Sequence, residues 1–289
     1  VARERVERIK TEKFFLFLHY WDTHPPFHCP RAHMPQVSSG DEEDVLEAKY
    51  RGAVRYVDQN IGEFVRFLEE KALLENSLVI LTSDHGESLR EHNILFDHHG
   101  LYDVTTHVPL VWHAPGLFPE SRRIPALVQH VDILPTVCDI LGTEASGDAF
   151  DGQSLLPLIS GKTSSIRDHV LIEESCAQRR VALRNLTHKY ILAPDGAAPC
   201  RYCQRIHGGA EELYDLEKDP DETHNRIRSD PEQAARMRQR LEEILRDLAD
   251  RRDRDLKKSP LVPRHQEPVI PPKERKKIRR KFKCLGYYD

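Results

Sequence analysis

An apolar, β-branched run at residues 78–82, LVILT, leads directly into the polar tetrapeptide SDHG at residues 83–86. A run of this length and composition is typical of a strand buried on both faces of a parallel sheet. In open α/β sheets, ligands bind beyond the carboxyl ends of the strands. The sequence therefore predicts an α/β fold that delivers Asp84 and His85 to the edge where ligands bind.

The residues after this strand carry a high density of imidazole and carboxylate groups. They are Glu87, Glu91, His92, Asp97, His98, His99, Asp103 and His107. Burying an isolated charge is costly in free energy, so these groups cannot all be buried without partners. The segment is therefore either a solvated loop or a site that binds a metal ion and an anion.

A second apolar run, Phe14–Leu18, predicts another buried strand, which also ends in polar residues, HYWDTHPPF at residues 19–27. The two prolines of this stretch stop any helix and favour an extended loop. Because two strands now end in His and Asp at the same expected edge, His24 is a candidate functional residue. For His19, an aromatic loop that plugs the sheet edge is an equally good interpretation.

The segments around these strands predict a scaffold of helices. Apolar residues recur at three- and four-residue spacing between Asp41 and Glu75, which indicates a long amphipathic helix packed on the sheet. Residues 108–112 predict a further short strand. His130 and Asp132 precede an apolar helical segment, and we expect a structural role for both because Asp132 is well placed to cap that helix.

From residue 167 onwards the chain changes to short alternating segments, at residues 169–174, 179–184, 188–192 and 212–216. Short strands separated by turn residues predict a small antiparallel sheet with a helix of about residues 231–251 packed on it. We therefore expect an α/β domain over 1–166, a small α+β subdomain over 167–250, and a basic, Pro-rich tail over 251–289. The tail has too little apolar content to fold alone.

Composition limits the class of protein. The 289 residues are 39% hydrophobic and 31% charged, with a net charge of -4, which describes a globular protein. No run approaches the roughly 20 apolar residues of a membrane span. The many acidic residues of the core do not favour nucleic-acid binding. For the basic C-terminal end, a solvated tail is the favoured interpretation. The start without Met suggests a piece of a longer polypeptide, and the compartment stays open.

Six cysteines show no regular spacing of a disulfide framework; they are Cys29, Cys138, Cys176, Cys200, Cys203 and Cys284. Cys200 and Cys203 are separated by two residues and followed by His207, so this group could hold a zinc ion. Half of a zinc site is weak evidence. A loop disulfide and free thiols are the alternatives.

Several motifs resemble the sulfatase family of the alkaline-phosphatase-like superfamily. They are WDTHPPF at 21–27, SDHGE at 83–87, HGLYD at 99–103, HVPL at 107–110, HVDILPT at 130–136 and ELYDLEKDP at 212–220, in family order. The resemblance implies an alkaline-phosphatase-like, mostly parallel sheet flanked by helices, with a small C-terminal antiparallel subdomain. It also implies hydrolysis of sulfuric esters. A phosphonate or phosphate ester hydrolase of the same superfamily is the alternative.

The resemblance also implies roles for particular residues. Asp84 and His85 match metal ligands of a family that usually holds calcium, and a His ligand leaves room for manganese or zinc. His24 matches a sulfate-binding histidine. His99 falls near the position of a lysine that contacts the sulfate, with His98 as its rival. We therefore expect His24, His98 and His99 to bind substrate, and His24 or His99 to assist catalysis.

Two landmarks of the family are not found in these residues. One is the formylglycine motif Cys/Ser-x-Pro/Ala-x-Arg that supplies the nucleophile, because Cys29-Pro30-Arg31 lacks its spacing. The other is the first pair of metal-binding aspartates. The resemblance thus predicts the C-terminal portion of a sulfatase, inactive alone, whose missing N-terminal segment supplies the nucleophile against a sulfated small molecule or glycan. A non-catalytic remnant that binds but turns over nothing is the alternative from another class.

Overall fold

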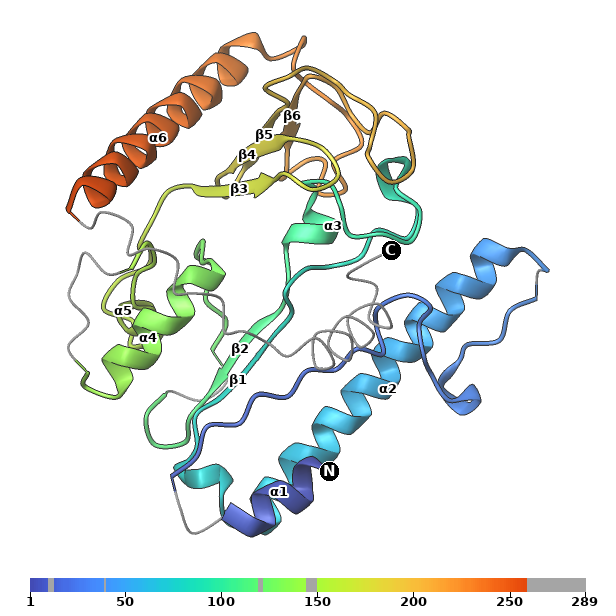
Figure 1. Cartoon of the computed structure of the whole chain (residues 1–289), viewed down its shortest axis with the longest axis vertical. Coiled ribbons are helices and arrows are strands. Elements are labelled where there is room, and N and C mark those ends of the chain that lie inside the picture. The colour runs from blue at the N-terminus through green and yellow to red at the C-terminus, as the bar shows by residue number, and fades with distance from the viewer. Residues whose placement is uncertain (10–12, 39, 119–121, 144–149, 259–289) are drawn as a thin grey trace, which may run out of the picture. The chain divides into compact units, whose positions relative to one another are not determined.

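The computed structural model describes residues 1–9, 13–38, 40–118, 122–143 and 150–258 (Figure 1). The chain divides into two compact units, Val1–Met237 and Arg238–Asp289. All the candidate site residues belong to the first unit. The described part of the second unit is the remainder of helix α6 (Pro231–Lys258), which is longer than the helix predicted for about 231–251. The boundary near residue 166 stays a prediction, and residues 259–289 of the basic tail lie outside the described residues.

The two strands expected around the central motif are present. β1 (Val79–Thr82) pairs with β2 (Leu110–His113), with Val79 opposite His113. The pairing is antiparallel, so the predicted parallel sheet is not confirmed within the described residues. Both strands are only partly buried, and Leu110 and Trp112 of β2 pack against the cluster of Leu155, Leu158 and Ile159.

The segment Phe14–Leu18 was expected to be a buried strand, and that prediction is wrong for the described chain. It pairs with no strand among the described residues. Phe15 and Phe17 are 90% and 75% exposed. An apolar segment becomes a central strand only when both of its edges find hydrogen-bonding partners, and this segment has none in the part of the chain that the structure describes.

A long helix packs beside the short N-terminal helix. α2 (Glu42–Glu70) confirms the amphipathic helix and begins at the N-cap Asp41, whose side chain accepts from the Glu43 amide at 3.2 Å. Val6 of α1 (Ala2–Ile9) packs with Phe67 and Leu68 of α2 in one buried cluster. Among the described residues, no helix combines the length and apolar character needed to cross a bilayer.

Short helices connect the remaining elements. They are α3 (Asp103–Thr106), α4 (Ile133–Ile140), α5 (Leu156–Ile159) and the 3-10 turns Arg31–His33, Leu74–Asn76, Glu91–Asn93 and His130–Asp132.

Asp132 has a structural role, as predicted, but its side chain does not cap α4. It is fully buried and accepts from both terminal nitrogens of Arg167 and from the amides of Gln129 and Gln153. A carboxylate buried this deeply is stable only with several strong donors, and Arg167 supplies the compensating charge.

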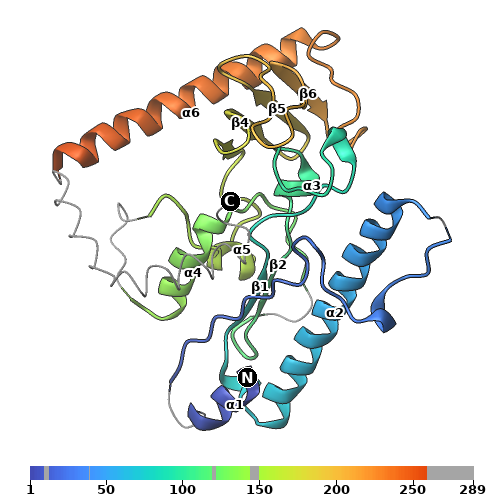
Figure 2. The ribbon, with the colours of Figure 1, turned by 45° about the vertical axis from the view of Figure 1, so that its right-hand side comes forward.

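The predicted C-terminal antiparallel sheet is confirmed. Its strands lie in the order β3 (Val170–Glu174), β4 (Arg180–Arg184), β5 (His188–Leu192) and β6 (Glu211–Asp215), all antiparallel to their neighbours. Alternation of apolar and polar residues makes such strands recognisable, since one face packs on a core. Figures 1 and 2 show α3 next to this sheet.

One core joins the histidine-rich loop to the sheet. Ile94, Leu101 and Tyr102 from the loop pack with Ala182, Ile191 and Tyr214 from the strands. Apolar burial of this kind contributes roughly 25 cal/mol per Å². The loop that carries His98 and His99 is therefore fixed against a hydrogen-bonded sheet.

Buried ion pairs strengthen the same junction. Asp103 of α3 accepts two hydrogen bonds from Arg184, at 3.1 and 3.0 Å. The Lys189 ammonium lies 2.5 Å from Asp103 Oδ1 and 2.8 Å from Glu222 Oε1, and the Lys189 side chain is fully buried. Two cations thus balance two carboxylates where α3 meets β4 and β5.

This network predicts a pH-dependent stability. Burial by itself raises the pKa of Asp103, but hydrogen bonds and charge from Arg184 and Lys189 outweigh it and lower the pKa from 3.8 to about 2. Because the folded-state pKa is the lower one, the carboxylate stabilises the fold fully above about pH 4, and this contribution is lost as the pH falls through about 2.

We expect Asp103→Asn to lower the free energy of unfolding by on the order of 2 kcal/mol at neutral pH. The two proteins should converge as the pH falls from about 4 toward 2, since protonated Asp resembles Asn. Urea denaturation of both proteins over a pH series measures the gap. A gap that stayed constant down to the lowest pH would show that the carboxylate charge is not the cause.

Candidate functional site

The tetrapeptide after β1 forms a tight, locked turn. Ser83 Oγ donates to the His85 carbonyl at 2.6 Å, and the Gly86 amide donates to the Thr105 carbonyl at 2.8 Å. A Cβ atom on Gly86 would lie 2.1 Å from the Val104 carbonyl oxygen, so only glycine fits. The turn therefore holds His85 in a defined place against the segment that begins at α3.

Three imidazoles from distant segments come together at this turn. The His85 ring stacks on the His98 ring with centroids 4.1 Å apart, and the His98 ring lies 5.8 Å from the ring of His24. His24 in turn stacks on Trp21 at 4.3 Å. The structure thus brings His24, His85 and His98 together, as expected of residues that gather at one edge.

Glu87 is a member of this site that sequence reasoning did not select. One ligand atom from each of His85, Glu87 and His98 lies within 4.8 Å of the others, which is close enough for one metal ion. Burial, with a further contribution from Asp97, raises the pKa of Glu87 to about 8. Its Oε1 atom is buried without a hydrogen-bond partner among the described residues. Its place in the SDHGE motif and among the many carboxylates and imidazoles that follow the strand were the signals for it.

The other groups of the site have unequal exposure. The Asp84 side chain is 68% exposed and lies 3.7 Å from His85 Nε2, outside the group of three ligands. Burial lowers the pKa of His98, and the neighbouring His85 lowers it further. The Asp97 carboxylate accepts from the His98 amide at 2.7 Å. Asp84 is therefore available from the solvent side, while burial and the neighbouring His85 disfavour the protonated form of His98.

His99 points to a different set of side chains from its neighbour His98. It is 6% exposed, and its Nε2 atom lies 3.6 Å from Cys200 Sγ. Its ring is 4.9 Å from the ring of His207. Consecutive residues of an extended chain face opposite sides, which separates the two histidines. The catalytic role of His99 stays a prediction, and the geometry favours His98 as the residue beside His24.

The chain belongs to the sulfatase family. The family model described as N-sulphoglucosamine sulphohydrolase, C-terminal, matches residues 90–251, more than half of the chain. The model described as Sulfatase matches residues 3–143. The two matches together include the motif at 83–87 and the antiparallel sheet. The predicted membership of the family is confirmed.

Individual proteins support the same family. Arylsulfatase K of Mus musculus is 32% identical over 210 residues, which cover 69% of this chain and 36% of that protein. A solved structure in complex with its substrate D-glucosamine-2-N,6-O-disulfate has a TM-score of 0.59 and 26% identity, over 72% of this chain and 41% of that one. The solved structure of the phosphonate monoester hydrolase of Agrobacterium radiobacter has a TM-score of 0.57 and 26% identity, over 73% of this chain and 42% of that one. The chain spans well under half of the length of the curated relatives it matches.

The residues of the site fit a divalent metal ion. Two imidazoles, a carboxylate with an unpartnered buried oxygen and a second, exposed carboxylate form a mixed set of nitrogen and oxygen donors. Oxygen donors suit calcium, whereas imidazoles move the preference toward manganese or zinc. Sulfatases are metal-dependent as a family, and this donor set is consistent with that property.

Proposed function

We propose that this chain supplies the anion-binding side of a sulfuric ester hydrolase site. The observation that carries the proposal is the convergence of His24, His85 and His98 from three segments of a chain that belongs to the sulfatase family. Imidazole nitrogens can donate hydrogen bonds to the oxygens of a sulfate group. His24 and His98 are therefore the proposed substrate-binding residues.

The proposed metal ligands are Asp84 and His85, and Glu87 joins them. A bound divalent ion would neutralise charge on the sulfate oxygens. Glu87 is uncharged at neutral pH without an ion because its pKa is about 8. A nearby cation favours its ionised form, so Glu87 would become a ligand when the site is loaded. Calcium stays the prediction from the family, with manganese and zinc as alternatives.

The proposed role of the histidines in turnover follows from their chemistry. Charge develops on the leaving oxygen when the bond to sulfur breaks, and His24 is proposed to donate a proton to it. Electrostatic stabilisation by positioned donors is usually the largest contribution to such reactions. The nucleophile is proposed to be a formylglycine on another segment of the same protein, which the family uses. The substrate class is proposed to be a sulfated glycan, by analogy with the relative that binds a glucosamine disulfate.

A phosphonate ester hydrolase is the second candidate, because a phosphonate monoester hydrolase has nearly the same structural similarity. We expect the complete protein to hydrolyse an aryl sulfate faster than the matched aryl phosphate and aryl phosphonate esters. Initial rates with the three esters at equal concentrations decide between them. A faster phosphonate reaction would favour the second candidate, and turnover of none of them would indicate a non-catalytic remnant.

A further inference from the structure

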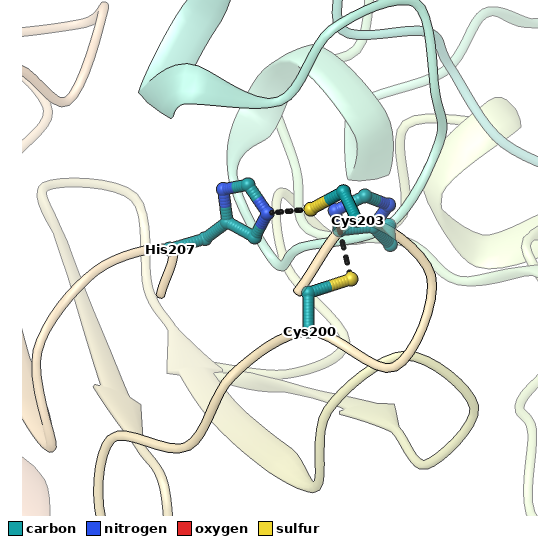
Figure 3. Close-up of side chains that lie close together, drawn as sticks. Cys200, Cys203 and His207 are labelled. Carbon is teal, nitrogen blue, oxygen red and sulfur yellow. Dashed lines mark hydrogen bonds between the residues drawn. The ribbon is translucent and has the colours of Figure 1, made fainter. Parts of the chain in front are cut away.

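A second group of metal-binding side chains lies on the other side of His99. Cys203 Sγ lies 2.9 Å from His207 Nε2, and Cys200 Sγ lies 3.6 Å from His99 Nε2. All four ligand atoms lie within 4.8 Å of one another. Figure 3 shows Cys200, Cys203 and His207 pointing toward one another. Two sulfur and two nitrogen atoms in this arrangement form the donor set of a tetrahedral zinc ion.

The spacing agrees with that geometry. Zinc binds sulfur at about 2.3 Å and imidazole nitrogen at about 2.0–2.1 Å, so a tetrahedral site needs roughly 3.6 Å between S and N. The distance from Cys200 to His99 has this value. The distance from Cys203 to His207 is shorter and would lengthen with an ion between the two atoms.

The outer nitrogen of each imidazole faces an oxygen acceptor. His99 Nδ1 lies 3.2 Å from Asp97 Oδ2, a charge contact without hydrogen-bond geometry, and His207 Nδ1 hydrogen-bonds with the His92 carbonyl oxygen at 3.4 Å. An acceptor at Nδ1 favours the tautomer with hydrogen there, which leaves the lone pair of Nε2 directed at the cysteines. Metal-binding histidines almost always have such a partner on the nitrogen that does not bind the ion.

The loop between β5 and β6 is folded to present both thiols. The Cys200 amide donates to the Arg205 carbonyl at 2.7 Å, and the Gln204 amide donates to the Cys200 carbonyl at 2.9 Å. The Tyr202 amide donates to Cys200 Sγ at 3.4 Å. A backbone donor stabilises the thiolate that a metal requires. Within the described residues the cysteines form no disulfide.

We propose that His99, Cys200, Cys203 and His207 bind one Zn²⁺ in a closed, structural site. On binding, both thiols lose their protons to the solvent and bind as thiolates. The ion joins the loop that follows β1 to the loop between β5 and β6. Since His99 is adjacent to His98, zinc would also hold the backbone from which His98 projects. The zinc site does not depend on the proposed hydrolase activity.

The test uses the full chain, purified under reducing conditions and loaded with Co²⁺ in place of zinc. We expect about one tightly bound ion with sulfur-to-cobalt charge-transfer absorption and tetrahedral ligand-field bands. Cys200→Ser with Cys203→Ser should abolish the charge-transfer absorption, whereas His85→Ala, in the other metal group, should keep it. Wild-type protein without this absorption, or its persistence in the double serine variant, would overturn the proposal.

A second measurement keeps the test valid if the serine variant does not fold. Wild-type protein purified with zinc is treated with an alkylating reagent and analysed by mass spectrometry. The exposed Cys176 is the internal control and should react at once. Cys200 and the exposed Cys203 should react only after a chelator is added. Reaction of both before chelation, or their recovery as a disulfide from the reduced preparation, would contradict the zinc site.

Discussion

Replacing Lys189 with Met is expected to lower the free energy of unfolding by about 3–5 kcal/mol. The Lys189 ammonium lies between Asp103 and Glu222, and its side chain is fully buried. Burial raises the pKa of Glu222, and Lys189 acts in the opposite direction. Without Lys189 the two carboxylates lose their shared counterion, and the cost of a buried, uncompensated charge destabilises the fold. Urea denaturation near neutral pH measures the loss.

An exposed ion pair in the loops that flank β4 and β5 gives the matched control. Arg179 lies 3.3 Å from Asp195, with side chains 69% and 62% exposed. Arg179→Met should change the free energy of unfolding by less than about 1 kcal/mol, as is usual for surface pairs. Adding Glu222→Gln to Lys189→Met should recover part of the loss. Equal effects of the two Met substitutions would show that the Lys189 network does not anchor the loop.

Asp84→Ala and His85→Ala should each lower kcat/KM for an aryl sulfate by about 10²- to 10³-fold in the complete protein. Both side chains follow β1 directly, and they are the proposed ligands of the divalent ion that offsets charge on the sulfate. Each variant should also contain less of the ion that supports turnover. Steady-state kinetics and elemental analysis of the same preparations measure both effects.

His224→Ala is the control for these two variants. Its side chain is 83% exposed and its partner is Asp219, away from the candidate site. We expect wild-type kinetics and metal content from this variant. If Asp84→Ala kept the metal-dependent rate of the wild-type protein, the proposed ligand role of Asp84 would be wrong.

The local elements were predictable, but the strand pairing was not. The periodicity of α2 is visible in the sequence, and the short segments after residue 167 indicated strands such as Arg180–Arg184, although their burial does not simply alternate. Pairing direction depends on contacts between distant segments. The run at 78–82 indicated a strand correctly, yet this strand is only partly buried and pairs antiparallel with β2. The exposed Phe14–Leu18 shows that apolar composition alone does not provide a strand with partners.

The candidate site, like the fold, was predictable in part. His24 and His85 each lie beside His98, but the predicted edge of a parallel sheet does not explain this, since 14–18 is not a strand in the described chain. The division between His98 and His99 could not be read from the sequence, because it depends on which way each side chain faces. Cys200, Cys203 and His207 are close in sequence and were recognised as half of a metal site. Their fourth partner, His99, is 101 residues from Cys200, so no local pattern connects them.

His24 and His98 are proposed to bind sulfate beside the divalent ion that His85 would help to hold. Calorimetric titration of the metal-loaded full chain with inorganic sulfate tests this sulfate binding directly. The titration needs no nucleophile. We expect saturable binding, and a Kd at least about tenfold higher for His98→Ala, equivalent to ~1.4 kcal/mol. His224→Ala should bind as the wild type does. Equal sulfate affinity for wild type and His98→Ala would contradict the account.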